Sequence, residues 1–265
     1  MQQALDFVAE STGLFHVVRD LGDKAWDQPT QFKGWTLNDV FVHLHFWNGM
    51  ADLSLQDPAG FAAQMAELFP QMQAQGMRAV ENAQIPLRGA ALRAAWWDLC
   101  QDMGPRWAAL DPKQRVAWVG PEMSVRSSIT ARQMETWAHG QEVFDLLGAT
   151  RDDADRIRNV VVLGVNTFGW TYKVRGQTPP GEMPQLRLTA PSGAVWDYGA
   201  PGSDLITGAA VEFAQVVAQT RNIADTKLQV QGDVARDWMS KAQCFAGGPE
   251  TPPAPGTRFR QEGAA

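Results

Sequence analysis

Residues 34–44 read GWTLNDVFVHL and mark the start of a helix. Thr36 is a suitable N-cap residue, and Asp39 follows three positions later, which is nearly a capping box. Apolar residues recur through the following turns, so we expect the helix to run to about residue 54. His43 shares a largely apolar face of this helix with Trp47. The stretch therefore predicts a helix that carries an inward-facing histidine.

A second stretch, residues 133–142, reads QMETWAHGQE and places Glu135 and His139 one helical turn apart. Residues at this spacing are neighbours on one helix face, where they could simply stabilise each other or pair with Arg132. If His43 faces this helix, the three side chains form a His₂Glu ligand set. Such a set suits Zn²⁺ with a fourth position open to water or substrate. Ni²⁺ and Fe²⁺ accept the same ligands.

The two remaining histidines do not fit this ligand set. His45 lies about 200° around the helix from His43, so the two rings cannot easily serve one site. His16 shares its helix face with Arg19 and Asp20, which indicates a solvated surface position. The candidate ligands are therefore His43, Glu135 and His139.

The rest of the chain predicts a helical part followed by a mixed part. Helical periodicity covers residues 2–21, 36–54, 58–80 with a kink or interruption at Pro70, 87–103, 128–147 closed by Gly148, and 152–172. Residues 175–181, rich in Gly and Pro, cannot continue a helix. A hairpin at 186–189 and 194–198, a helix at 204–220, a strand at 228–230 and a helix at 234–245 follow. We expect a helical bundle at 1–175, a small α/β domain at 176–248 and a flexible tail at 249–265.

Composition excludes several classes of protein. The net charge of −6 and the pI near 5.2 argue against a nucleic-acid partner. The N-terminus lacks the features of a signal peptide, and the most apolar run, residues 160–165, is too short to cross a membrane. The two cysteines provide no disulfide framework. We expect a cytoplasmic protein without a membrane partner.

The two motifs resemble those of DinB-like proteins, and in particular the maleylpyruvate isomerase branch. The resemblance covers roughly residues 1–170 and implies a four-helix bundle that holds a divalent metal, usually zinc. Carried over to this sequence, the ligands fall on His43, Glu135 and His139. Residues 225–233, DTKLQVQGD, are similar to a segment of domains that follow such bundles. Those domains include sterol-carrier-like modules and one named for wyosine base formation.

The resemblance also implies a chemistry. Characterised isomerases of this family use mycothiol, a low-molecular-weight thiol, as cosubstrate, and a zinc ion with an open position can lower the pKa of a thiol. We therefore expect a thiol-dependent isomerase or transferase acting on a small molecule. Glu142 would orient His139 or shuttle a proton, and Arg132 would attract a substrate carboxylate. Trp47 and Trp137 would line the substrate pocket.

Two other functions agree with the same residues. A non-catalytic protein could keep the metal for structure and bind an apolar ligand elsewhere. A hydrolase could use water at the open metal position as its nucleophile. The sequence leaves the substrate and the oligomeric state open, with a homodimer as one alternative.

Overall fold

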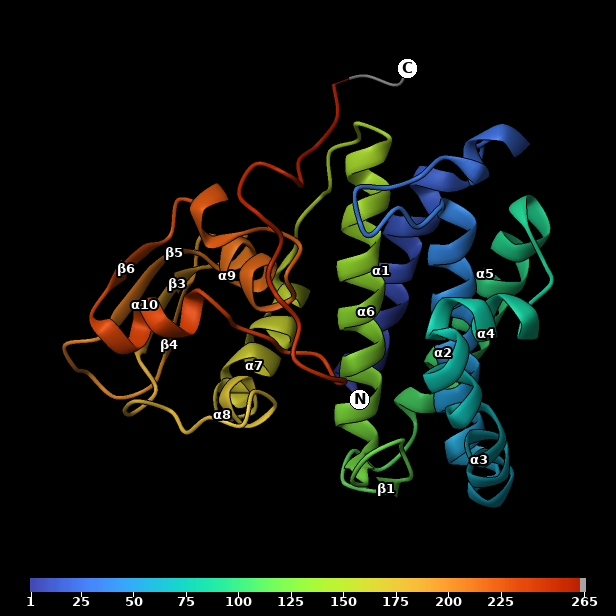
Figure 1. Cartoon of the computed structure of the whole chain (residues 1–265), viewed down its shortest axis with the longest axis horizontal. Coiled ribbons are helices and arrows are strands. Elements are labelled where there is room, and N and C mark those ends of the chain that lie inside the picture. The colour runs from blue at the N-terminus through green and yellow to red at the C-terminus, as the bar shows by residue number, and fades with distance from the viewer. Residues whose placement is uncertain (263–265) are drawn as a thin grey trace. The chain divides into compact units, whose positions relative to one another are not determined.

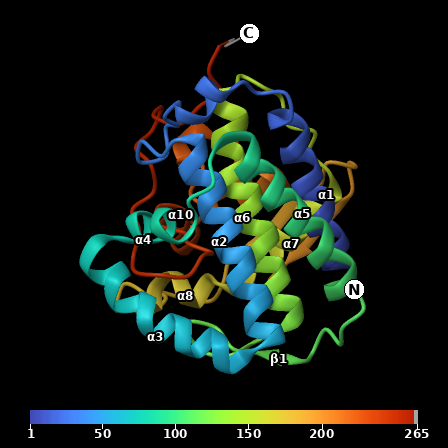
Figure 2. The same cartoon turned by 90° about the vertical axis from the view of Figure 1, so that its right-hand side faces the viewer.

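Four long helices pack side by side in the first part of the chain (Figure 2). In this computed structural model, which describes residues 1–262, they are α1 (Gln2–Val18), α2 (Leu37–Gln56), α5 (Gly89–Ala108) and α6 (Val125–Leu146). Helices α1 and α2 each pack against both α5 and α6, which closes a four-helix bundle. Large side chains fill its interior without exposure to solvent, among them Phe7, Phe41, Trp96 and Trp107.

Helix α2 begins where the sequence predicts. The hydroxyl of Thr36 accepts a hydrogen bond of 3.1 Å from the backbone N–H of Asp39. The carboxylate of Asp39 accepts one of 2.9 Å from the backbone N–H of Thr36. This capping box satisfies N–H groups that have no partner within the helix, and it fixes the register of α2 and hence the direction of His43.

Helices α3 (Pro58–Gln75) and α4 (Met77–Gln84) pack against α2. The predicted interruption at Pro70 is wrong, because α3 continues through this residue. Pro70 removes a hydrogen bond to the carbonyl of Ala66, and both residues are exposed, so water can take the place of the missing donor. The helix breaks instead at Gly76, whose φ of 86° suits glycine.

Helix α5 also runs further than predicted, through Gly104 and Pro105 to Ala108. Gly104 is buried against α1, and a Cβ atom at this position would lie 2.0 Å from Cγ2 of Val8. The glycine therefore permits a close approach of two bundle helices. A short hairpin that the sequence did not predict, β1 (Arg115–Val116) and β2 (Met123–Ser124), then leads into α6. A 3₁₀ turn, η1 (Asp23–Asp27), precedes α2.

The second part of the chain contains a four-stranded sheet in the order β4-β3-β5-β6. Its strands are β3 (Gln185–Thr189), β4 (Val195–Tyr198), β5 (Leu205–Ala209) and β6 (Gln229–Gln231). The predicted hairpin is confirmed as the antiparallel pair β3–β4. The helix predicted from residue 204 is wrong in its first turns, because β5 pairs in parallel with β3 and buries Ile206. A helix begins only at Ala210.

Short helices accompany this sheet (Figure 1). They are η2 (Asp155–Ile157), α7 (Arg158–Asn166), α8 (Phe168–Lys173), α9 (Ala210–Val217), η3 (Ile223–Asp225) and α10 (Asp233–Met239). Trp238 lies between the rings of Phe168 and Phe213, with centroids 5.0 and 5.7 Å away. This aromatic cluster joins α8, α9 and α10 into one core.

The chain divides into two compact units, Met1–Leu146 and the residues from Leu147 onward. Gly148, with a φ of 63°, follows the end of α6 as the sequence predicts. Residues 147–175 group with the second unit, whereas the sequence assigned them to the bundle. A contact between α8 and α10 contributes to this grouping, since Tyr172 donates a hydrogen bond of 2.9 Å to Asp237.

Residues 249–262 of the segment predicted as a flexible tail make hydrogen bonds with the rest of the second unit. Side chains of the second unit hold this Pro- and Gly-rich segment through its backbone. Gln243 accepts a hydrogen bond from the N–H of Glu250, and Asn222 donates one of 2.8 Å to the carbonyl of Pro253. Composition alone misses such contacts, because the partners lie in other segments of the chain. Residues 263–265 lie outside the described residues.

The predicted fold class, a helical bundle followed by a small α/β domain, is confirmed. Within residues 1–262, no helix combines the length and the apolar character needed to cross a membrane.

Candidate metal centre

Helices α2 and α6 bring His43, Glu135 and His139 together. One ligand atom from each side chain lies within 4.8 Å of the other two. Nε2 of His43 lies 3.6 Å from Oε2 of Glu135, and Nε2 of His139 lies 3.4 Å from the same oxygen. The three side chains predicted as a ligand set from helix faces are therefore neighbours in space.

A carboxylate from α4 holds the other side of His43. Glu81 is fully buried, and its Oε1 atom lies 3.0 Å from Nδ1 of His43. The same oxygen accepts a hydrogen bond of 2.6 Å from Nε1 of Trp47. The two nitrogens of the His43 ring thus face two different carboxylates.

A tight turn between η1 and α2 places two aromatic rings against the histidines. Lys33 and Gly34 both have positive φ, 51° and 67°, and the N–H of Trp35 donates to the carbonyl of Phe32. The ring of Trp35 stacks on His139, nearly parallel at 5.6 Å, and Phe32 meets His139 edge-on at 5.1 Å. These half-buried rings cover one side of His139.

The charges at the site depend on one another. Burial by itself lowers the pKa of His43, but the nearby carboxylates of Glu81 and Glu135 outweigh it and raise the pKa to about 9. Burial raises the pKa of Glu135, yet the two histidines and Arg132 hold it well below 4.5. For His139, burial dominates and lowers the pKa. In the absence of a metal, His43 is therefore the protonated partner of two carboxylates.

The raised pKa of His43 predicts that the metal-free protein loses stability at alkaline pH. The folded state holds this proton more tightly than the unfolded chain, whose histidine has a pKa near 6.5. This contribution is fully present below pH 6.5 and is lost as the pH rises through about 9. With a chelator present, the melting temperature should therefore fall over this range more in the wild type than in His43→Gln. Parallel curves for the two proteins would contradict this expectation.

The other predicted site residues differ in their placement. Arg132 is buried with its guanidinium over the ring of Trp118, 5.4 Å from the centroid, and its Nη1 atom has no hydrogen-bond partner within residues 1–262. Trp47 and His43 both contact Oε1 of Glu81, so Trp47 lies close to the candidate metal centre. Trp137 is buried about 200° around α6 from Glu135, which places it on the opposite face. Glu142 is buried one turn beyond His139, and its catalytic role stays a prediction.

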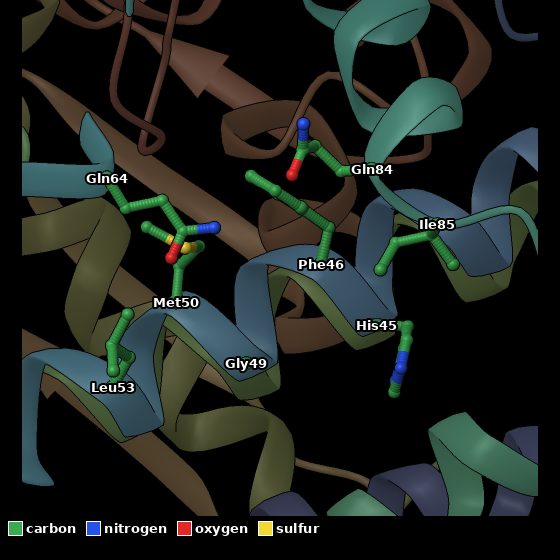
Figure 3. Close-up of a pocket in the computed structure, with 8 residues that line it drawn as sticks. All are labelled: His45, Phe46, Gly49, Met50, Leu53, Gln64, Gln84 and Ile85. Carbon is green, nitrogen blue, oxygen red and sulfur yellow. The ribbon is translucent and has the colours of Figure 1, made fainter. Parts of the chain in front are cut away.

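His45 lies away from the ligand set, as its position on the helix indicates. It lines a separate cavity of 340 Å³ beside α2, together with Phe46, Gly49, Met50, Leu53, Gln64, Gln84 and Ile85. Figure 3 shows its ring pointing away from Gln64 and Gln84. Burial lowers the pKa of His45. A second cavity, of 430 Å³, is lined by apolar residues of α3 and by residues 117–119, and neither cavity is lined by the three candidate ligands.

The spacing of the candidate ligands is compatible with a tetrahedral metal ion such as zinc. Around a tetrahedral zinc with ligands at 2.0–2.1 Å, neighbouring donor atoms are roughly 3.4 Å apart. The two nitrogen–oxygen separations of 3.4 and 3.6 Å match this value. Among the described residues, no fourth His, Cys, Asp or Glu joins the group. One coordination position of a bound ion would therefore remain available.

Comparison with known families identifies the first unit. Residues 7–144, slightly more than half of the chain, match the family described as the mycothiol maleylpyruvate isomerase N-terminal domain. The chain belongs to this family. The match spans α2 and α6 and so includes all three candidate ligands.

Members similar to this chain over nearly its whole length occur in Mycobacterium tuberculosis. Two proteins described as uncharacterized, one from each of two strains, are 35% identical over 248 residues. The alignment covers 92% of this chain and 95% of each relative. The similarity therefore extends through both units.

Two crystal structures share the fold. The mycothiol-dependent maleylpyruvate isomerase and a mutant of it with one histidine replaced by alanine each superpose with a TM-score of 0.54. The identity is 16%, and the match covers 82% of this chain and 88% of the other. At this identity the likeness supports the fold, which is that of a thiol-dependent isomerase.

Two groups of side chains at the site were not found from the sequence. Glu81 lies on another helix, 38 residues from His43 and outside both motifs, and its one signal is a carboxylate next to the buried Val80. Phe32 and Trp35 flank the turn before α2. Trp35 belongs to the quoted motif, but its contact with His139 depends on the packing of α2 against α6.

Proposed function

We propose that the protein is a metal-dependent enzyme that uses a small thiol to isomerise or transfer groups on a small-molecule substrate. His43, Glu135 and His139 would hold the ion, and zinc fits this ligand set best, although Ni²⁺ and Fe²⁺ accept it too. The observation that carries the proposal is the approach of these three ligand atoms to within 4.8 Å, without a fourth protein ligand in the described residues. Membership of the isomerase family supports the thiol.

A bound zinc ion would supply the Lewis acidity that lowers the pKa of a thiol and makes a nucleophile available at neutral pH. The role of the protein is to present the ligands and to exclude water. Phe32 and Trp35 cover the histidines on one side. Glu81 and Trp47 close the side of His43 that faces α4.

Arg132 places a positive charge close to the proposed metal site, because its proximity helps to lower the pKa of Glu135. Its buried Nη1 atom has no hydrogen-bond partner among the described residues, which supports a role in binding a negatively charged substrate group. We keep Glu142 as the residue that would orient His139 or move a proton.

A thiol titration tests this proposal. The protein loaded with Co²⁺ should develop an absorption band in the near ultraviolet when mycothiol, cysteine or 2-mercaptoethanol is added, because a thiolate bound to cobalt gives a charge-transfer transition. Ethylene glycol, the oxygen analogue of 2-mercaptoethanol, should give no such band. A spectrum that stays unchanged with every thiol would remove the thiol chemistry and favour a hydrolase or a non-catalytic binder.

A further inference from the structure

Glu81 reaches the candidate metal centre from α4, a helix that supplies none of the three ligands. Its Oε1 atom lies 3.0 Å from Nδ1 of His43, and the side chain is fully buried. We propose that Glu81 is a positioning residue that keeps the proton of neutral His43 on Nδ1 and so presents the lone pair of Nε2 to the metal. This inference rests on the proposed metal site.

The geometry assigns different tasks to the two ring nitrogens. Nδ1 faces the Glu81 carboxylate, whereas Nε2 faces Glu135, the ligand shared with His139. An ionised carboxylate can only accept hydrogen bonds, and the contact of Nδ1 with Glu81, at 3.0 Å, is shorter than the 3.6 Å contact of Nε2 with Glu135, so the proton of neutral His43 belongs on Nδ1. In metal sites, a histidine whose second nitrogen donates to a carboxylate is fixed in both tautomer and ring orientation.

Trp47 determines the orientation of Glu81. It lies one turn after His43 on α2, and its indole N–H donates to the same Oε1 atom at 2.6 Å. Both donors therefore approach this oxygen from one helix. Among the described residues, the other oxygen, Oε2, is buried without a hydrogen-bond partner, so the hydrogen bonds of Glu81 found there go to His43 and Trp47.

Contacts on both sides of Glu81 hold α4 in place. Val80 is buried in a cluster with side chains of α2 and α3, among them Phe46 and Met50. Asn82 donates a hydrogen bond of 2.8 Å to Asp39, the capping residue of α2. Glu81 is thus held between two anchors to α2, which sets the distance from its carboxylate to His43.

Zinc affinity and NMR of the full chain test the proposal with two variants. Glu81→Leu introduces an apolar side chain of similar size and removes the acceptor, and should weaken zinc binding by about 10–100-fold in a competition titration. Glu81→Gln keeps an acceptor oxygen but removes the charge, and should lose less. Glu67→Gln, the same change at an exposed position on α3, is the matched control and should bind zinc like the wild type.

The second readout is the position of the proton on His43. Long-range ¹H–¹⁵N spectra of the metal-free protein at alkaline pH, where the ring is neutral, should show the proton on Nδ1 in the wild type and in Glu81→Gln, and Glu81→Leu should lose this preference. If Glu81→Leu binds zinc like the wild type and keeps the proton on Nδ1, the positioning role is overturned while the metal site stands. If Glu81→Leu does not fold, Glu81→Gln gives the test. A changed His43 tautomer together with wild-type zinc affinity in Glu81→Gln would overturn the positioning role, because the tautomer would then have no effect on metal binding.

A failure of the metal site itself gives a different pattern. The wild type would then bind no zinc, which overturns the proposed function. The tautomer of His43 can still be measured in the metal-free protein at alkaline pH, where the ring is neutral. A proton on Nε2 under these conditions would also overturn the positioning role of Glu81.

Discussion

Alanine at position 43, 135 or 139 should abolish the binding of the divalent ion that we propose for this site. The wild type should carry close to one divalent ion per chain, measured by elemental analysis. Each of His43→Ala, Glu135→Ala and His139→Ala should weaken zinc binding by more than about 100-fold, because losing a direct ligand has a larger effect than losing an outer hydrogen-bond partner. All three variants should lose affinity because the three ligand atoms lie within 4.8 Å of one another.

His45→Ala is the matched control for this experiment. His45 lies on the same helix as His43 and lines a different cavity, so this variant should keep its metal. Circular dichroism would show whether each variant retains its helices. Metal that persists in Glu135→Ala or His139→Ala, with the fold intact, would refute the ligand set.

Gly104→Val should destabilise the bundle by about 3 kcal/mol, because it forces a side chain into a close contact between two helices. The first atom of the new side chain would lie 2.0 Å from Cγ2 of Val8 on α1. Valine is stiff at χ1, so α1 and α5 would have to separate. Chemical denaturation should show a lower midpoint with an unchanged slope.

Two further proteins make this prediction specific. Gly49→Val lies inside α2, where a Cβ atom meets nothing within 4 Å, and its stability should stay within about 0.5 kcal/mol of the wild type. Adding Val8→Ala to Gly104→Val should restore part of the lost stability, because it removes the clashing methyl group. Additive effects in the double variant would show that the contact with Val8 is not the cause.

Local patterns predicted the part of the site that lies within single helices. The capping box at Thr36 and Asp39 sets the start of α2, and the i to i+4 spacing places Glu135 beside His139. Helical periodicity then predicts that His43 faces the interior of the bundle. These features depend on residues close in sequence, which is why they could be predicted without a structure.

Features that depend on long-range packing were missed or wrong. The strand β5 forms because residues 205–209 find a partner in β3, although the same residues also suit a helix. Helix α5 continues past Pro105, where we expected it to end. Glu81 was missed for the same reason. Its proposed role depends on the packing of α4 against α2, and no pattern in the sequence indicates that contact.

The ligands on α2 and α6 are separated by about 90 residues of chain, and both cysteines are free. An ion held by His43 and Glu135 therefore acts as a reversible cross-link in a protein that has no disulfide to serve this purpose, and closing so long a loop restricts the unfolded chain strongly. The fraction of sites that hold metal and the free energy of unfolding are then linked. At a free metal concentration 100 times the dissociation constant, the folded state gains about 2.7 kcal/mol. If the proposed site binds metal, the concentration of free metal would therefore also change the fraction of the protein that is folded.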